Sequence, residues 1–469
     1  MSKAFPKDDP FLRGNFAPVL TESDAYDLPI EGEMPKELGG TLYRNGPNPQ
    51  FAPRGFYHWF AGDGMLHAFR IDNGRVSYRN RWVRTPKWKM EHEAGQALYG
   101  SFGNPMWSDP VTFGKDSTTA NTNVVWHAGK LMALEEAHLP FEVDARSLDA
   151  KGDVTYGGKL KSRMTAHPKI DPRSGELISF AYSASGRFTN TIAYYTVDKA
   201  GTLTRYDEFE APYSSMVHDF NVTEDFVLFP ILPLTGSIER AMNGKPAFAW
   251  EPDKGSRIGV LRRGDPIERM RWFTGDPCYV FHPLNAWNVG NKIYADVMEY
   301  PKAPLFPNPD GSLIDQSKVF ATLVRWSFDL DSNSDTFKRE AIDDAPGEFP
   351  RLDERRAMLS YRHSYYAGYR PGQVIGNFNA IGHIDHKTGK RQRFDLPQGD
   401  ATSEAVFVPR SETAEEGDGF LLATIYRGEE NRSDLCVFDA QSVAKGPIAT
   451  AQLSARVPFG FHGNWAQGQ

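Results

Sequence analysis

The sequence predicts an all-β protein, a seven-bladed β-propeller with loops and short helices capping one face. A short motif recurs along most of the 469 residues, the turns inside it carry hairpin residues, and few segments suit helices. Repeated hairpins at a regular interval favour a closed ring of sheets, in which each unit covers its neighbour. We therefore expect one propeller domain over residues 1–469. A large irregular β-sandwich is the alternative.

The recurring motif is an apolar residue beside an aspartate, then a turn, then an alternating strand. A seventh copy, around Val260, keeps the hairpin pattern without the aspartate. The turns contain Asn-Gly, Lys-Ala-Gly or Lys-Thr-Gly, and glycine accepts the positive φ that tight hairpins require. The spacing averages about 61 residues, which gives seven units over the chain. The six aspartates are Asp72, Asp144, Asp198, Asp329, Asp385 and Asp439.

Other segments fill in the expected elements. Residues 226–234 (FVLFPILPL) read as a core strand that leads into a loop, because Pro230 and Pro233 interrupt the apolar run. Residues 237–242 and 413–416 are the candidate short helices.

Composition excludes several classes of function. The net charge is −7 and no basic block is present, so a nucleic-acid partner is not expected. No apolar run approaches the roughly 20 residues of a membrane-spanning helix. The two cysteines, Cys278 and Cys436, cannot form a disulfide framework, and the first residues lack the apolar core of a signal peptide. We expect a cytoplasmic protein without a protein partner. Peripheral membrane contact at residues 226–243 stays open.

Four of the twelve histidines share a setting, a short apolar or aromatic run at a strand end. They are His167, His218, His282 and His462, separated by 51, 64 and 180 residues. Each of them taken singly is more easily explained by packing, as is His67 within a strand. Four such residues from separate blades fit a metal ion on the axis of a propeller.

Motifs along nearly the whole chain resemble those of the carotenoid cleavage oxygenases, a group that includes apocarotenoid, lignostilbene and isoeugenol oxygenases. They include RNGPNP at 44–49, GDGM at 62–65, FHPLNAW at 281–287 and HGNW at 462–465. The resemblance implies a non-haem Fe(II) held by His167, His218, His282 and His462. It also implies that Glu136, Glu348 and Glu404 orient those histidines. The C-terminal segment would then be anchored by a metal ligand.

The resemblance further implies oxidative cleavage of a conjugated C=C bond by O2, giving two carbonyl products without nicotinamide or flavin. A small apolar alkene would reach the iron through an apolar tunnel. The aromatic candidates to line it are Phe60, Phe102, Phe281, Trp287, Phe459 and Phe461.

The identity of the alkene depends on two positions. The lignostilbene and isoeugenol branch holds a phenolic oxygen with a tyrosine and a lysine, where this chain has Phe102 and Glu135. A phenolate facing a phenylalanine and a carboxylate would lose about 2 kcal/mol. We therefore expect an apocarotenoid or similar polyene, with a stilbenoid or phenylpropenoid alkene as the alternative.

Three further classes of function fit the predicted propeller and its histidines less well. A non-catalytic binding propeller would have no use for the four histidines. An isomerase or hydrolase on the same fold and a propeller glycosidase complete the alternatives. The glycosidase would require a pair of carboxylic acids in a cleft.

Overall fold

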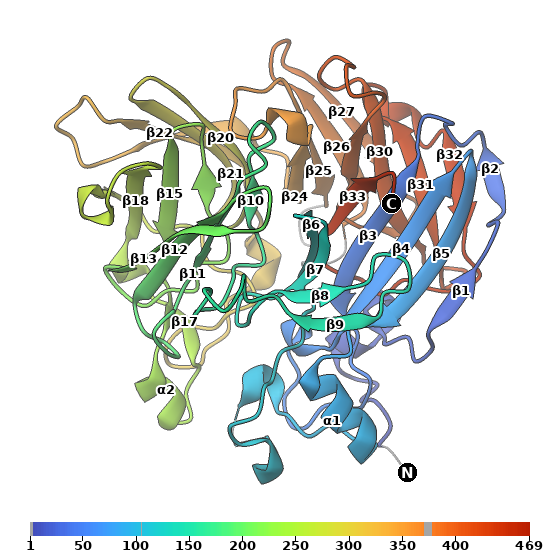
Figure 1. Cartoon of the computed structure of the whole chain (residues 1–469), viewed down its shortest axis with the longest axis horizontal. Coiled ribbons are helices and arrows are strands. Elements are labelled where there is room, and N and C mark those ends of the chain that lie inside the picture. The colour runs from blue at the N-terminus through green and yellow to red at the C-terminus, as the bar shows by residue number, and fades with distance from the viewer. Residues whose placement is uncertain (1–2, 105, 370–377) are drawn as a thin grey trace. The chain divides into compact units, whose positions relative to one another are not determined.

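The computed structural model describes residues 3–104, 106–369 and 378–469 (Figure 1). The chain divides into two compact units. Unit 1 comprises residues 1–155, 396–414 and 418–469, and unit 2 comprises residues 156–395 and 415–417. Over the described residues, three sheets of four or more strands belong to unit 1 and four belong to unit 2. This number matches the seven recurring units of the sequence.

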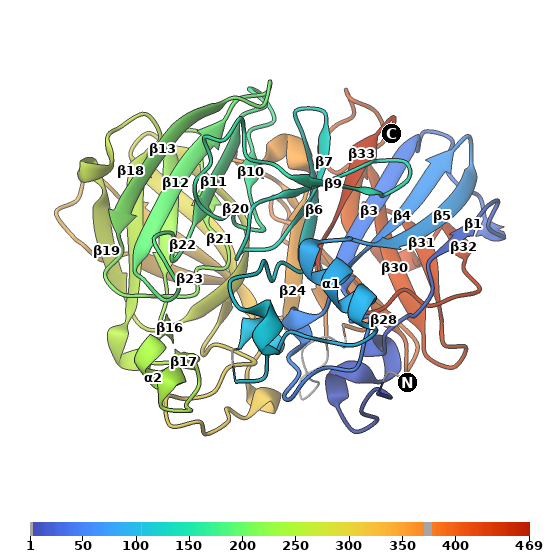
Figure 2. The same cartoon turned by 60° about the horizontal axis from the view of Figure 1, so that its bottom comes forward.

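Unit 1 is built from three antiparallel sheets (Figures 1 and 2). The first has the order β1 (Ser23–Ala25), β5 (Arg75–Trp82), β4 (Gly64–Asp72), β3 (Gly40–Pro47) and β33 (Gly463–Gln467). The second contains β6 (Asn123–His127), β7 (Lys130–Leu134), β8 (Phe141–Val143) and β9 (Ala150–Asp153). The third has the order β2 (Ile30–Gly32), β32 (Ala449–Gln452), β31 (Arg432–Asp439), β30 (Gly419–Arg427) and β28 (Ala401–Thr402), with β29 (Val406–Pro409) also paired to β30.

Unit 2 is built from four antiparallel four-stranded sheets and one short ribbon. The first two sheets are β10 (Lys169–Ile170), β11 (Leu177–Ala181), β12 (Thr191–Val197) and β13 (Leu203–Glu210), and β14 (Asn221–Val222), β15 (Phe226–Ile231), β18 (Ser256–Arg262) and β19 (Arg271–Gly275). The next is β20 (Tyr279–Val289), β21 (Lys292–Tyr300), β22 (Thr322–Asp329) and β23 (Lys338–Asp343). The last is β24 (Gly347–Leu352), β25 (His363–Gly368), β26 (Ala380–Asp385) and β27 (Lys390–Asp395), and the ribbon pairs β16 (Leu234–Gly236) with β17 (Phe248–Trp250).

Every hairpin expected from the recurring motif is present. The six aspartates end, or directly follow, β4, β8, β12, β22, β26 and β31, and each of these strands pairs with the strand after it. The motif around Val260 forms the β18–β19 pair. The repeat therefore marks the same two strands in all seven sheets. The segment 226–234 also forms the expected core strand, since all six residues of β15 are buried.

The C-terminal segment closes the first sheet of unit 1. Strand β33 pairs with β3 along its whole length, from Gly463 opposite Arg44 to Gln467 opposite Gly40. Because β3 comes from the beginning of the chain, this pairing joins the two termini in one sheet. It supports the prediction that the tail is anchored.

The helices agree only in part with the sequence. Helix α2 (Ile238–Met242) forms where it was expected, with Ser237 capping its N-terminus. The expected helix at residues 413–416 is wrong, because this stretch consists of turns and irregular backbone. Glu416 instead accepts hydrogen bonds from the backbone N–H groups of Arg362 and His363, and four residues are too few to nucleate a helix unaided.

Helix α1 (Pro86–Ala94) was not predicted. Thr85 caps it, Pro86 occupies its first position and Gly95 ends it with φ 66°. Its Lys87 lies 2.6 Å from Asp63 and 2.7 Å from Glu91, and all three side chains are buried. Burial lowers the pKa of Lys87, but the two carboxylates outweigh that effect and hold it above its ordinary value.

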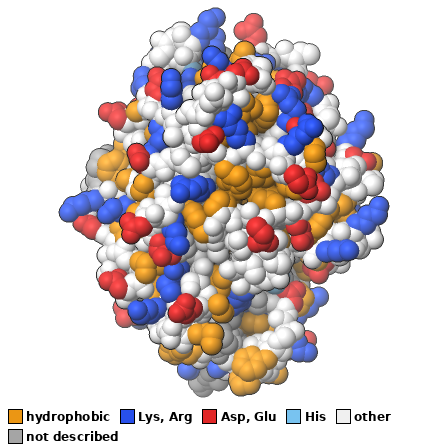
Figure 3. Space-filling model, turned by 90° about the vertical axis from the view of Figure 1, so that its left-hand side faces the viewer, with side chains coloured by type: hydrophobic (Ala, Val, Ile, Leu, Met, Phe, Trp, Pro, Cys, Tyr) orange, Lys and Arg blue, Asp and Glu red, His pale blue; other side chains and the backbone are white. Residues whose placement is uncertain are grey.

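On the face in Figure 3, Lys and Arg side chains alternate with Asp and Glu. None of the helices in the described part of the chain has the length and apolar character needed to cross a bilayer.

Candidate metal centre

Three of the predicted ligands lie together within unit 2, at the starts of three different sheets. His167 precedes β10 by two residues, and His218 precedes β14 by three. His282 lies within β20. In each sheet the histidine is therefore on or next to the first strand. Thr165 links two of the segments, since its hydroxyl lies 3.1 Å from His167 N and 3.4 Å from His218 O.

The three rings point their Nε2 atoms at one another. His218 Nε2 lies 3.0 Å from His167 Nε2 and 3.3 Å from His282 Nε2. Two imidazole nitrogens bound at right angles to one ion, with bonds of about 2.1 Å, lie about 3 Å apart. The spacing of the three nitrogens therefore fits ligands of a single metal ion. Imidazole suits iron, zinc, copper and nickel alike.

His282 is oriented by a carboxylate. Its Nδ1 lies 2.6 Å from Glu348 Oε2, and this glutamate is only 3% exposed. A carboxylate accepts the Nδ1 proton, so the ring keeps Nε2 for a metal. The ring of Phe349 stacks on His282 at 5.1 Å between centroids, and Phe349 N–H donates to the same glutamate oxygen. The orienting role of Glu348 stays a prediction, which this contact supports.

His462 has a matching arrangement within unit 1. Its Nδ1 lies 3.1 Å from Glu404 Oε1, and Gly463 N–H donates to the other oxygen at 2.9 Å. The backbone of His462 is also fixed, because its N–H donates to Thr122 O and its carbonyl accepts from Asn45 N–H. Glu404 and His462 are both buried.

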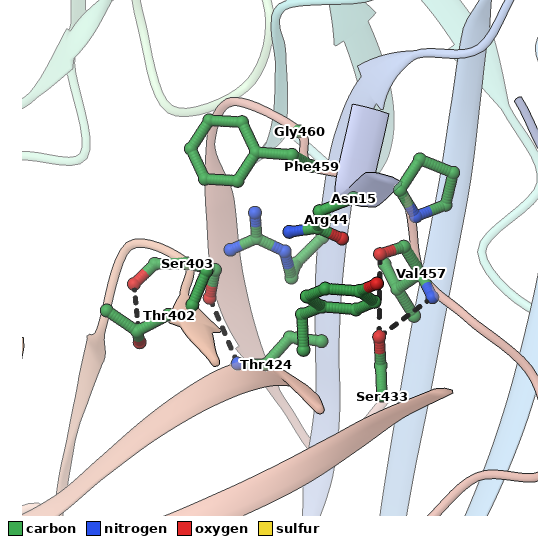
Figure 4. A pocket seen from close by; sticks show the side chains of 12 residues that line it. Asn15, Arg44, Thr402, Ser403, Thr424, Ser433, Val457, Phe459 and Gly460 are labelled. Atoms are coloured by element: carbon green, nitrogen blue, oxygen red, sulfur yellow. Dashed lines mark hydrogen bonds between the residues drawn. The ribbon is translucent and has the colours of Figure 1, made fainter. Parts of the chain in front are cut away.

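Arg44, from the RNGPNP motif, contacts the backbone next to His462 and Glu404. Its guanidinium donates to the backbone carbonyls of Glu404 and of Phe461, the residue before His462, at 3.5 and 3.4 Å. The guanidinium points into a small cavity of unit 1, beside Asn15 and Phe459 (Figure 4). The cavity has room for about one water molecule and has no carboxylate in its lining. It is too small to be a substrate chamber.

The two remaining glutamates differ in their surroundings. Glu136 is half-buried just after β7 in unit 1, and its predicted role stays a prediction. Glu135, the expected substrate-facing carboxylate, is occupied within unit 1. One of its oxygens accepts hydrogen bonds from the N–H groups of Thr119 and Ala120 at 2.8 and 3.1 Å and from the Thr119 hydroxyl. It holds a loop in place.

The aromatic candidates fall into two groups. In unit 2, Phe281 packs edge-on against His218, at 5.2 Å between centroids, whereas Trp287 stacks on Tyr294. In unit 1, Phe60, Phe102, Phe459 and Phe461 belong to one aromatic cluster, whose other members are Phe11, Phe16, His58 and Trp59. Phe102 is 47% exposed and has φ 55°.

Sequence reasoning missed several members of these groups. His58 was not among the sequence-based candidates, and it is buried between Phe60 and Phe102, at 4.7 and 5.0 Å between ring centroids. The run FYHWF at 56–60 was the signal that could have revealed it, since aromatic residues gathered this densely rarely line a solvent loop. Asp219, beside His167, was missed as well.

The comparisons with known proteins identify the family. The family model described as retinal pigment epithelial membrane protein matches residues 16–467. The chain belongs to this family. The resemblance to the carotenoid cleavage oxygenases is thereby confirmed, and the chain is an oxygenase-type enzyme of the alkene-cleaving kind.

Individual members of the family are similar over their full length. An isoeugenol monooxygenase of Pseudomonas nitroreducens is 40% identical, with 98% of each chain covered. The crystal structure of Pseudomonas brassicacearum lignostilbene dioxygenase matches with a TM-score of 0.96 at 36% identity, over 100% of both chains. A Synechocystis apocarotenoid oxygenase variant matches with a TM-score of 0.85 at 27% identity, over 96% of this chain and 97% of its own. The seven-bladed β-propeller predicted from the sequence is confirmed.

Proposed function

We propose that this protein is a non-haem Fe(II) oxygenase that cleaves the conjugated C=C bond of a stilbenoid or phenylpropenoid alkene into two carbonyl products. The observation that carries the proposal is the convergence of three Nε2 atoms in unit 2, in a chain of this family. O2 is the co-substrate.

The proposed ligands are His167, His218, His282 and His462. His462 is included because its Nδ1 is held by Glu404 in the same way that Glu348 holds the Nδ1 of His282. Both rings therefore keep Nε2 available. Glu136 is the proposed third glutamate. Four neutral imidazoles would leave Fe(II) its full charge and two open positions, and the bound iron would supply the activation of O2.

The proposed substrate class differs from the apocarotenoid that we expected from the sequence. That expectation depended on two effects. Phe102 offers no hydrogen bond to a phenolic oxygen, and the carboxylate of Glu135 would repel a phenolate. The carboxylate of Glu135 is engaged by Thr119 and Ala120, so it offers less repulsion than its position suggested. The relatives named for isoeugenol and lignostilbene are also more similar than the apocarotenoid oxygenase. Both facts favour the smaller aromatic alkenes.

The aromatic cluster of unit 1 supports the same class. His58, Phe60, Phe102 and Phe461 present ring faces and edges that suit an arylalkene. Among the candidates we propose Phe60, Phe102, Phe281 and Phe459 as substrate contacts, with Glu135 supporting the loop at 119–120 rather than touching substrate.

The test is a substrate panel with iron-loaded protein. Isoeugenol, a 4-hydroxystilbene and an apocarotenal are incubated separately, and carbonyl products are identified by mass. We expect aldehydes from the two phenols and slower or no turnover of the apocarotenal. Cleavage of the apocarotenal alone would overturn the substrate class. Absence of iron after anaerobic reconstitution would overturn the oxygenase and favour a binding scaffold.

A further inference from the structure

The sequence assigns three glutamates to four histidines, so one imidazole has no assigned carboxylate. In unit 2 the neighbour of His167 is an aspartate. We propose that Asp219, held in place by Lys169, is the positioning carboxylate of His167. The inference rests on the proposed metal site and deepens it.

Asp219 directly follows one proposed ligand and faces another. Its Oδ2 lies 3.5 Å from Nδ1 of His167. Its Oδ1 lies 2.7 Å from Nζ of Lys169 and accepts the N–H of Phe220 at 2.6 Å. Two short segments therefore cross-link each other: 167–169 contributes a histidine and a lysine, and 218–220 contributes the carboxylate between them.

The exposures distinguish this group from an ordinary surface ion pair. The side chain of Asp219 is 3% exposed, whereas that of Lys169 is 27% exposed. A carboxylate buried to that extent requires more than one partner. The lysine and the backbone N–H contact Oδ1, and Oδ2 lies 3.5 Å from Nδ1 of His167. A positive metal ion beyond His167 would add a further favourable charge.

The consequence for His167 is a fixed ring. With Nδ1 turned toward Asp219, its Nε2 is turned toward His218 Nε2, at 3.0 Å. His282 and Glu348 make a closer contact between the same kinds of atom, at 2.6 Å compared with 3.5 Å for His167 and Asp219. Partners of this kind set the tautomer and the ring orientation, and their loss typically costs 10- to 100-fold in metal affinity.

The experiment measures metal affinity and does not depend on turnover. Asp219→Asn and Asp219→Ala are compared with wild type in anaerobic competition of Fe(II) and Co(II) against a chelator, and the Co(II) absorption bands are recorded. Glu348→Gln is the positive control. Asp225→Asn is the matched negative control, because Asp225 is a nearby aspartate whose carboxylate accepts from Asn288 at 2.8 Å instead.

We expect about 10-fold weaker metal binding in Asp219→Asn and a larger loss in Asp219→Ala. The Co(II) bands should shift in both, and Asp225→Asn should behave as wild type. Lys169→Met should give a smaller loss with the same spectral shift, which preserves the test if the aspartate variants do not fold. Unchanged metal affinity and Co(II) spectra in Asp219→Asn would overturn the inference while leaving the proposed function intact. If Asp219→Asn does not fold, the same result in Lys169→Met would overturn it. Failure of wild type to bind either metal would overturn both.

Discussion

The two units hold their histidines in different ways. Unit 2 brings three imidazoles together from residues on or next to the first strands of three sheets, and each of these strands pairs with the next strand of its own sheet. Unit 1 supplies a single histidine from the last residues of the chain, and holds it with Glu404, the backbone of Asn45 and the pairing of β33 with β3. Carboxylates contact histidines in both units, but only the histidine near the C-terminus is also held by a strand pairing with a distant part of the chain.

The largest expected effect is on a unit 2 ligand. His282→Ala should abolish both metal retention and turnover, because it removes an Nε2 from the group and leaves Glu348 buried without its imidazole partner. Bound iron is quantified after reconstitution, and turnover is followed on the substrate panel. His386→Ala is the matched control, since His386 contacts Ser364 at 2.8 Å and should change neither. Retention of one iron per chain by His282→Ala would contradict the assignment.

The next largest effect is a loss of unfolding free energy when the cation of a buried ion pair is removed, in each unit. Lys87→Met in unit 1 leaves Asp63 and Glu91 buried without their cation and should cost about 3–5 kcal/mol of unfolding free energy. In unit 2, Arg325→Met should cost less, because the Arg325 side chain is 26% exposed and Tyr361 continues to donate to Asp296. Urea unfolding measures both. Equal losses would show that burial does not distinguish the two groups.

The third prediction compares Glu348, which contacts His282 in unit 2, with Glu404, which contacts His462 in unit 1. Glu348→Gln and Glu404→Gln should each weaken metal binding by about 10- to 100-fold. We expect the larger loss for Glu348→Gln, because its contact is 2.6 Å and that of Glu404 is 3.1 Å, and because β33 fixes the backbone of His462 independently. Chelator competition under anaerobic conditions gives both affinities, and the reverse order would show that the chain end depends on its carboxylate.

A smaller effect is a loss of stability in mild acid. Burial lowers the pKa of His58 to about 4 and of His67 to about 3 in unit 1, and of His383 to about 4 in unit 2. These folded-state values lie below the ordinary value near 6.5, so the unfolded chain binds protons first, and stability is lost as the pH falls from about 6.5 toward 4. At pH 6 each histidine should cost about 1 kcal/mol.

Hydrogen exchange at pH 7 and pH 6, corrected for its intrinsic pH dependence, resolves this loss by unit. Burial also lowers the pKa of His363 and His386 in unit 2. With three such histidines against two, unit 2 should lose more protection than unit 1. Equal losses in both units would contradict the comparison.

The smallest effect is expected at the cysteines, where the units are alike. Cys436 of unit 1 and Cys278 of unit 2 are both free and buried, and burial raises the pKa of each thiol to about 12. Neither should react with a thiol reagent at pH 8 until the protein unfolds. Fast labelling of one of them in the native protein would reveal local opening in the unit that contains it.

The sequence by itself determined the repeated architecture. The motif around Asp72 and its six counterparts specifies a strand, a turn and a strand through local chemistry, and local chemistry is readable without the fold. It also singled out His167, His218, His282 and His462 by their apolar settings, together with the glutamates that the family resemblance implied.

Only the tertiary structure decided what those residues touch. Segments far apart in the chain place Glu348 on His282 and Asp219 beside His167, and the loop at 119–120 takes up the carboxylate of Glu135. The helix at 86–94 has local end signals in Thr85, Pro86 and Gly95, but the burial of its Lys87 against Asp63, 24 residues away, exists only in the fold. Periodicity and turn residues act between neighbours in sequence, but hydrogen bonds and charges act between neighbours in space, and those exist only once the sheets have packed.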